Sequence, residues 1–131
     1  MENNANAPRK RHVLIVDDDD RLAQFLKKLL ELHGYEAEVA TDGKLALKHV
    51  LEHHTDVVLC DLQMPTLEGD LFYATVERVK PAVARRFIFI TGHADDPHFH
   101  TFVTTVDAPV LQKPVPMEKL VAVVEDVIQR A

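Results

Sequence analysis

Cysteine, glycine and long apolar runs are all scarce in this chain of 131 residues. The single cysteine, Cys60, excludes an internal disulfide framework and fits a reducing compartment. No apolar run approaches the roughly 18 residues that a membrane helix needs, and the stretch from Met1 to His12 is too polar for a signal peptide. We therefore expect a cytoplasmic protein without membrane insertion.

Basic residues are outnumbered, with 15 Lys and Arg against 21 Asp and Glu and a formal net charge of −6. Nucleic-acid binding needs a basic surface, so direct DNA binding is disfavoured. With 47% hydrophobic residues, four glycines and seven prolines, the chain is not disordered, collagenous or low in complexity. Its length allows one ordinary domain, expected over residues 12–131 behind a flexible polar tail at residues 1–11.

Five short segments have the apolar character of β-strands. His12–Val16, Val57–Cys60 and Phe87–Ile90 are rich in β-branched or aromatic residues, as strands covered on both faces are. Tyr35–Val39 alternates between polar and apolar residues, and Val110–Leu111 is short and follows a proline, which is typical of edge strands. The pattern predicts three central strands and two edge strands.

Apolar residues recur at helical spacing after each predicted strand. Asp42 and the pair Asp96-Pro97 precede two of these stretches as caps, Gly34 ends the first stretch, and Pro81 follows the third. The five predicted helices cover Leu22 to Leu30, Leu47 to Leu51, Phe72 to Val79, Phe99 to Val106 and Met117 to Ile128. Five β-then-α units predict an α/β fold, a single doubly wound five-stranded parallel sheet with five flanking helices.

Reactive side chains follow four of the five predicted strands. Asp17 and Asp18 follow the first strand, Asp61 the third, Thr91 the fourth and Lys113 the fifth. Because sites of open α/β sheets lie beyond the carboxyl ends of the strands, we expect one shared crevice. Crowded carboxylates need a cation, and Mg²⁺ prefers oxygen ligands. An ammonium and a hydroxyl suit the oxygens of a phosphoryl group, so the sequence indicates phosphoryl transfer to an aspartate.

The residues at these strand ends resemble the receiver domain of two-component response regulators. The resemblance runs from about His12 to the end of the chain and rests on separate motifs in one order. These motifs are Val16-Asp17-Asp18, Asp61-Leu62-Gln63-Met64-Pro65 with Glu68-Gly69, Ile90-Thr91-Gly92 and Gln112-Lys113-Pro114. The resemblance implies the flavodoxin-like strand order 2-1-3-4-5 of the chemotaxis receiver, which agrees with the two predicted edge strands.

The resemblance also implies a role for each site residue. Asp61 is the implied phosphoacceptor, which attacks a phosphohistidine on a partner kinase. The implied Mg²⁺ ligands are the side chains of Asp18 and Asp61 and the backbone carbonyl of Gln63, with Asp17 acting mostly through bound water. Such a chain is not an enzyme, apart from autocatalysed phosphoryl transfer to its own aspartate and hydrolysis from it.

Other roles implied by the resemblance concern the phosphoryl group itself. Thr91 hydrogen-bonds the group, Lys113 pairs with it and with Asp61, and a cis bond usually precedes the position of Pro114. The family often has Tyr or Phe as a rotating reporter where this chain has Val110, so that readout is absent.

Gln63 and His93 occupy the positions where the family tunes its hydrolysis rate, so the lifetime of the aspartyl phosphate stays open. The implied partners are a sensor histidine kinase or phosphotransfer protein and an unidentified downstream protein. The chain is a free-standing receiver, a phosphorelay intermediate or the receiver portion of a hybrid histidine kinase. A phosphatase with an aspartate nucleophile is a weaker alternative, because the amide of Gln63 cannot transfer the proton that its second carboxylate would.

Several further residues are interpreted structurally. Cys60 lies inside an apolar strand and is expected to be a buried, inert thiol. His93, His98 and His100 are expected at the surface rather than in a metal site. The β-branched run from Val103 to Val106 predicts a marginal end of the fourth helix. The surface formed by this helix, the fifth strand and the fifth helix is the predicted output surface.

Overall fold

Alternate residues of the first strand, β1 (His12–Val16), point into two different hydrophobic cores. Val13 and Ile15 pack with side chains of the first and last helices. Leu14 and Val16 pack with the helices on the opposite face of the sheet. All four side chains are buried, so the strand needs apolar residues on both faces, and its sequence supplies them without alternation.

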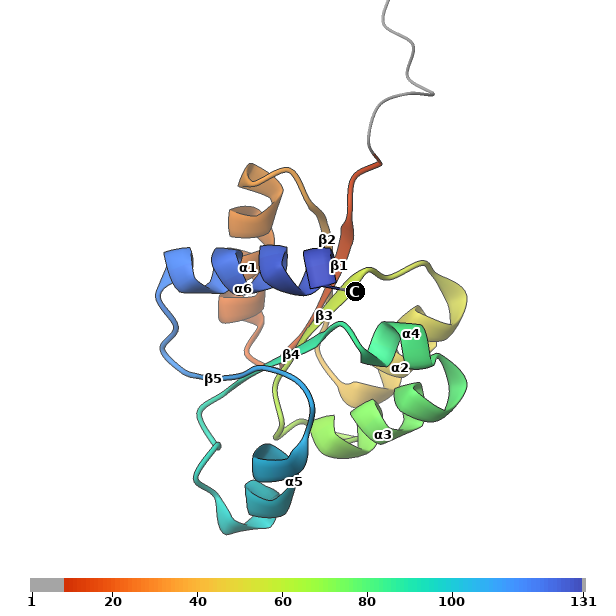
Figure 1. Ribbon diagram of the computed structural model, residues 1–131, viewed down its shortest axis with the longest axis vertical. Coiled ribbons are helices and arrows are strands. Elements are labelled where there is room, and N and C mark those ends of the chain that lie inside the picture. The colour runs from red at the N-terminus through yellow and green to blue at the C-terminus, as the bar shows by residue number, and fades with distance from the viewer. Residues whose placement is uncertain (1–8, 131) are drawn as a thin grey trace, which may run out of the picture.

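The computed structural model describes residues 9–130, which form a parallel sheet in the order β2-β1-β3-β4-β5 between two layers of helices (Figure 1). The other strands are β2 (Glu36–Ala40), β3 (Val57–Cys60), β4 (Phe87–Thr91) and β5 (Val110–Gln112). The helices are α1 (Asp20–Leu32), α2 (Gly43–Glu52), α3 (Gly69–Val79), α4 (Pro81–Ala84), α5 (His100–Thr105) and α6 (Met117–Arg130), with a 3-10 turn, η2 (Pro97–Phe99), before α5. Helices α1 and α6 cover one face, and α2, α3 and α5 cover the other.

The predicted fold and strand order are confirmed. The bounds of β1 and β3 are as predicted, and those of the other three strands differ by one residue. All five predicted helices are present. The structure has a sixth, α4, beginning at Pro81, where the sequence predicts only the end of α3. Pro81 ends α3 and also begins α4, because proline fits the first turn of a helix, whose N–H groups have no partner within the helix.

The two predicted helix caps, Asp42 and Asp96, are confirmed. The side chain of Asp42 accepts a hydrogen bond from Leu45 N at 2.9 Å, and Asp96 accepts one from His98 N at 2.9 Å. The fourth predicted helix is shorter than expected, because its first turn is the 3-10 turn η2 and Val106 is already extended. Its marginal end therefore agrees with its poor helix propensity.

Within residues 9–130, no helix is both long and apolar enough to cross a membrane. The predicted tail at residues 1–11 lies mostly outside the described residues, which begin at Arg9. Arg9, Lys10 and Arg11 are exposed and have no regular secondary structure.

Candidate functional site

Three aspartates meet where β1 and β3 end. Asp17 follows β1 and Asp61 follows β3, and these two residues are 4% and 5% exposed, whereas Asp18 is exposed. One carboxylate oxygen from each residue lies within 4.8 Å of the others. Because β1 and β3 are paired in parallel, with Val16 opposite Cys60, the residues that follow these two strands are placed side by side.

The ammonium group of Lys113 bridges two of these carboxylates. Nζ donates to Oδ2 of Asp17 at 2.8 Å and to Oδ2 of Asp61 at 3.0 Å. Burial alone would lower the pKa of Lys113, but the hydrogen bonds and charges of the two aspartates outweigh burial and raise that pKa. Burial also raises the pKa of Asp17 despite the hydrogen bond from Lys113. Lys113 is therefore held as a cation inside the cluster.

The segment that carries Lys113 is fixed to the sheet. Its backbone N–H donates to the carbonyl of Thr91 at 2.9 Å, which continues the pairing of β4 with β5 beyond Gln112. The bond between Lys113 and Pro114 is cis, as the resemblance implied. The sequence-based pairing of Lys113 with Asp61 is present, and the direct contact with Asp17 is an addition.

The loop after Asp61 is tightly packed against the sheet. Leu62 N donates to Oδ1 of Asp61 at 2.7 Å, and Gly69 N donates to the carbonyl of Leu62 at 2.7 Å. A Cβ atom on Gly69 would lie 2.2 Å from the carbonyl oxygen of Asp61, so only glycine fits this approach without a backbone shift. Thr66 has a φ of 67°, which few residues other than glycine adopt.

The remaining predicted residues lie around the same crevice. Gln63 and His93 line a cavity of about 580 Å³ together with Asp18 and Asp61. Thr91 is fully buried at the end of β4, and its Oγ1 accepts a hydrogen bond from His93 N at 2.9 Å. All the predicted site residues thus lie at or beside the carboxyl edge of the sheet.

An ion pair at the mouth of this cavity was missed by sequence reasoning. Glu68 lines the cavity, and its Oε1 lies 2.9 Å from Nε2 of His98 in η2. This hydrogen bond raises the pKa of His98. His98 is exposed, as predicted, but 30 residues separate the two partners, so no local pattern in the sequence marks the pair.

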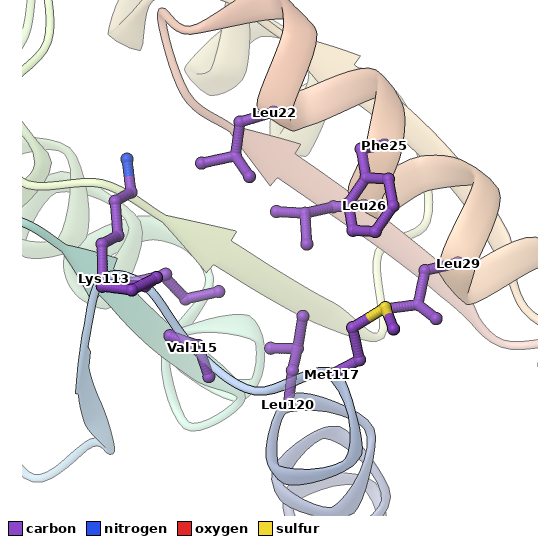
Figure 2. A pocket seen from close by; sticks show the side chains of 10 residues that line it. Leu22, Phe25, Leu26, Leu29, Lys113, Val115, Met117 and Leu120 are labelled. Atoms are coloured by element: carbon purple, nitrogen blue, oxygen red, sulfur yellow. The ribbon is translucent and has the colours of Figure 1, made fainter.

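An apolar groove of about 470 Å³ adjoins the site through Lys113 (Figure 2). One wall comes from α1, where Phe25 is 51% exposed, and the other comes from the segment Val115–Leu120, where Met117 is 47% exposed. Exposed apolar side chains around one groove are typical of surfaces that bind a partner.

The donor set at the aspartate cluster fits a hard divalent cation. Mg²⁺ prefers carboxylate, carbonyl and water oxygens and is bound by one or two carboxylates in phosphoryl-transfer sites. Asp17, Asp18 and Asp61 supply the carboxylates, and the segment through Gln63 borders the same cavity. The cluster is therefore suited to Mg²⁺ and a phosphoryl group together.

Comparisons with known proteins agree with this geometry. The family model for the response regulator receiver domain matches residues 13–125. The chain is 33% identical to the probable transcriptional regulator ycf27 of Cyanidium caldarium over 95 residues. This match covers 72% of this chain and 36% of that protein. A match of 60 residues, 42% identical, to the CAI-1 autoinducer sensor kinase/phosphatase CqsS of Vibrio cholerae covers 46% of this chain and 9% of that protein. The chain thus spans about a third or less of these relatives.

Among solved structures, a CheY-like response regulator receiver domain from Methanospirillum hungatei JF-1 superposes with a TM-score of 0.85 at 25% identity. The superposition covers 93% of this chain and 96% of that chain, so the likeness extends over the whole domain. The match to the family model, the strand order and the aspartate cluster beside Lys113 agree with one another. The chain belongs to the receiver domain family of two-component response regulators.

Proposed function

We propose that this receiver domain accepts a phosphoryl group on Asp61 and that the resulting aspartyl phosphate switches the binding of a partner protein. The observation that carries the proposal is the bridge from Lys113 Nζ to Oδ2 of Asp61 at 3.0 Å, beside Asp17 and Asp18. A buried carboxylate at a strand end, held by an ammonium and faced by two further carboxylates, has the parts of a phosphoryl-transfer site.

The transfer is a single displacement at phosphorus. A carboxylate oxygen of Asp61 forms the new P–O bond while the P–N bond to the donor's histidine breaks, and the electron pair of that bond stays on the imidazole nitrogen. Lys113 and the hydroxyl of Thr91 stabilise the phosphoryl oxygens. Asp18, Asp61 and the backbone carbonyl of Gln63 would hold Mg²⁺, with Asp17 acting through water. The bound ion would neutralise developing negative charge on the phosphoryl oxygens.

The phosphoryl group on Asp61 would be lost again by hydrolysis. Gln63 and His93 line the same cavity as Asp61, so they are placed to contact the water that would attack the phosphorus. We assign them the tuning of the aspartyl-phosphate lifetime. The chain then turns over only its own phosphoryl group. A phosphatase acting on other substrates is not supported, because the amide of Gln63 cannot act as the general acid and base that the second carboxylate of such enzymes provides.

The phosphodonor is a sensor histidine kinase or a phosphotransfer protein, as membership of this family implies. Any such donor must bring its phosphohistidine beside Lys113, and the apolar groove lined by Phe25 and Met117 begins there. We propose this groove as the donor's docking surface. The chain is also similar to part of a sensor kinase, so we retain the alternative that it is the receiver portion of a hybrid histidine kinase.

We also propose cytoplasmic location, which suits the reduced thiol of Cys60, and a receiver domain at residues 12–131 that follows the polar sequence of residues 1–11. In the structure Cys60 is buried, and burial raises the pKa of its thiol well above the usual value, so the thiol is inert as predicted.

Intact-mass measurement tests the phosphoacceptor proposal. Incubation of the full chain with a small phosphodonor and Mg²⁺ should add one phosphoryl group, which is released in base. The group should be absent without Mg²⁺ and in Asp61→Asn. Equal labelling of the parent and of Asp61→Asn would overturn the assignment.

The proposed output surface is formed by helix α5, the edge strand β5 and helix α6. Helix α5 is the element of this surface that we expect to move. It has six residues and none of them is buried, and its threonine hydroxyls bond back to carbonyls of the same helix. Weak packing and poor propensity leave this helix free to shift between states that differ by a few kcal/mol. Amide exchange with and without beryllofluoride should change across residues 99–111. Changes confined to other segments would remove α5 from the output route.

A further inference from the structure

Four histidines line a groove at the edge of the sheet opposite to the aspartate cluster. This groove has a volume of about 440 Å³ and lies where β1 and β2 begin, whereas Asp17 and Asp61 follow the ends of their strands. The ionisable residues that line it are His12, Glu36, Glu38, His49, His53 and His54. None of these residues takes part in the function proposed above.

The fold brings these residues together from three elements. His12 is the register partner of Glu36, and Leu14 is the partner of Glu38, so the two glutamates lie on the same face of the sheet as His12. Helix α2 covers that face. Its last turn carries His49, and His53 follows four residues later as the C-cap.

The two histidines of α2 form a pair. Residues four apart lie on one side of a helix, and the ring centroids of His49 and His53 are 4.7 Å apart. The backbone N–H of His53 donates to the carbonyl of His49 at 2.8 Å, which fixes the end of the helix between them. Two imidazoles at this spacing on a helix can coordinate the same metal ion, as they do in zinc enzymes.

Carboxylates orient the other two rings. Nε2 of His12 lies 3.2 Å from Oε2 of Glu36, which makes Nδ1 the nitrogen available for coordination. A carboxylate on the second nitrogen is the usual support of a metal-binding histidine. His54 has the same kind of support, because its Nε2 lies 2.9 Å from Oδ1 of Asp56. We choose His12 as the third imidazole because it lies on β1 beside Glu36, on the sheet face that α2 covers, whereas His54 follows the end of α2.

We propose that His12, His49 and His53, with Glu38 as an oxygen ligand, form a binding site for a divalent transition metal ion such as Zn²⁺. Three imidazoles and one carboxylate are a donor set for Zn²⁺ and a poor one for Mg²⁺, so the two ends of the sheet select different ions. Among the described residues, the aspartate cluster is the group whose ligand atoms already lie within 4.8 Å of one another. The proposed histidine site therefore requires the side chains of His12, His49 and His53 to turn toward one another when the ion binds.

Calorimetric titration of the full chain, carrying no affinity tag and held in excess Mg²⁺, tests the site with Zn²⁺ alone. We expect one Zn²⁺ per chain and, in NMR spectra of the histidine rings, shifts of His12, His49 and His53. Replacing either helix histidine, in His49→Gln or His53→Gln, should weaken binding at least about tenfold. Glu36→Gln should weaken it by about the same factor, since the support of a ligand is lost.

Two matched variants separate this site from other zinc binding. His100→Gln removes an exposed histidine elsewhere and should leave the affinity unchanged. Asp18→Ala disrupts the aspartate cluster and should leave it unchanged too. Because His53 is exposed, His53→Gln is expected to fold, and a thermal melt without metal confirms this. Parent-like affinity in both helix variants, loss of zinc binding in Asp18→Ala, or ring shifts that follow pH alone without saturable zinc binding would overturn the proposal.

Discussion

Lys113 Nζ lies 3.0 Å from Oδ2 of Asp61, while the other oxygen of that carboxylate accepts a hydrogen bond from Leu62 N at 2.7 Å. The carboxylate is therefore held at both oxygens, by a cation from the β5–α6 segment and by the backbone of its own loop. Its orientation is fixed before any phosphodonor arrives. Positioning of this kind lowers the barrier to a displacement reaction, because little reorganisation remains to be made.

Removing that cation should destabilise the metal-free protein. In Lys113→Met, the buried carboxylates of Asp17 and Asp61 lose their partner, and we expect the free energy of unfolding to fall by about 1–3 kcal/mol. Mg²⁺ should then stabilise the variant more than the parent, since the ion replaces the lost positive charge. Urea denaturation with and without Mg²⁺ measures both effects. Lys119→Met, at an exposed position of α6, is the control, and equal losses in the two variants would contradict the account.

Asp18 should matter for the ion and little for the fold. It is the exposed member of the cluster, and the ion pairs of Lys113 go to Asp17 and Asp61 instead. Asp18→Ala should therefore lose most of the thermal shift caused by Mg²⁺, because a carboxylate ligand is gone. Without metal, its melting temperature should equal or exceed that of the parent, since one of three crowded negative charges is removed. A parent-like shift with Mg²⁺ would show that Asp18 is not a ligand.

The site could be located from the sequence because the carboxyl ends of parallel strands all lie at one edge of the sheet. Residues that follow different strands in the sequence are therefore neighbours in the structure. Asp17, Asp61 and Thr91 each stand at the end of an apolar run, so their meeting follows from the topology. The histidine groove could not be found this way. The spacing of His49 and His53 is visible in the sequence, but that His12 lines the same groove depends on how α2 packs over β1 and β2.

The ends of the helices were also only partly predictable from the sequence. Pro81 predicts the end of α3, but proline is equally compatible with the first turn of a following helix, which is its place in α4. The short length of α5 was partly predictable, because a run of β-branched residues has poor propensity. The 3-10 turn before it was not, since it depends on how Phe99 is buried in the core.

Glycine at position 69 should be required for the geometry of the acceptor loop. Its missing Cβ would lie 2.2 Å from Asp61 O and 2.9 Å from Leu62 Cα, so alanine must push the backbone of the acceptor. We expect Gly69→Ala to lose about 1–3 kcal/mol of stability and to slow phosphorylation. Gly92→Ala is the matched control beside Thr91, where a Cβ meets nothing within 4 Å. Similar stability of the two variants in chemical denaturation would refute the packing argument.

Asp56 should make the stability of the folded protein depend on pH in the acid range. Burial would raise its pKa, but the hydrogen bonds from His12 N and His54 and the charge of Arg11 together lower it below the usual 3.8. A lowered pKa in the folded state means that the stabilisation is complete above pH 3.8 and is lost as the pH falls further. Asp56→Asn should lose about 1–2 kcal/mol at neutral pH, where a hydrogen-bonded anion is replaced by an amide.

The stability difference between the parent and Asp56→Asn should shrink as acid protonates the parent's carboxyl group. Denaturant midpoints at neutral pH and at successively lower pH follow this difference. Asp95→Asn, at an exposed position, is expected to change little at any pH. A difference that stays constant through the acid range would show that ionised Asp56 does not stabilise the fold.

Locating the phosphoryl group within the chain is the most direct test of Asp61 as the acceptor. Borohydride reduces an aspartyl phosphate to homoserine, so the phosphorylated protein can be reduced, digested and sequenced by mass spectrometry. We expect homoserine at position 61, dependent on Mg²⁺, with Asp17 and Asp18 unmodified in the same sample. Homoserine at either of those two aspartates, with Asp61 intact, would contradict this assignment.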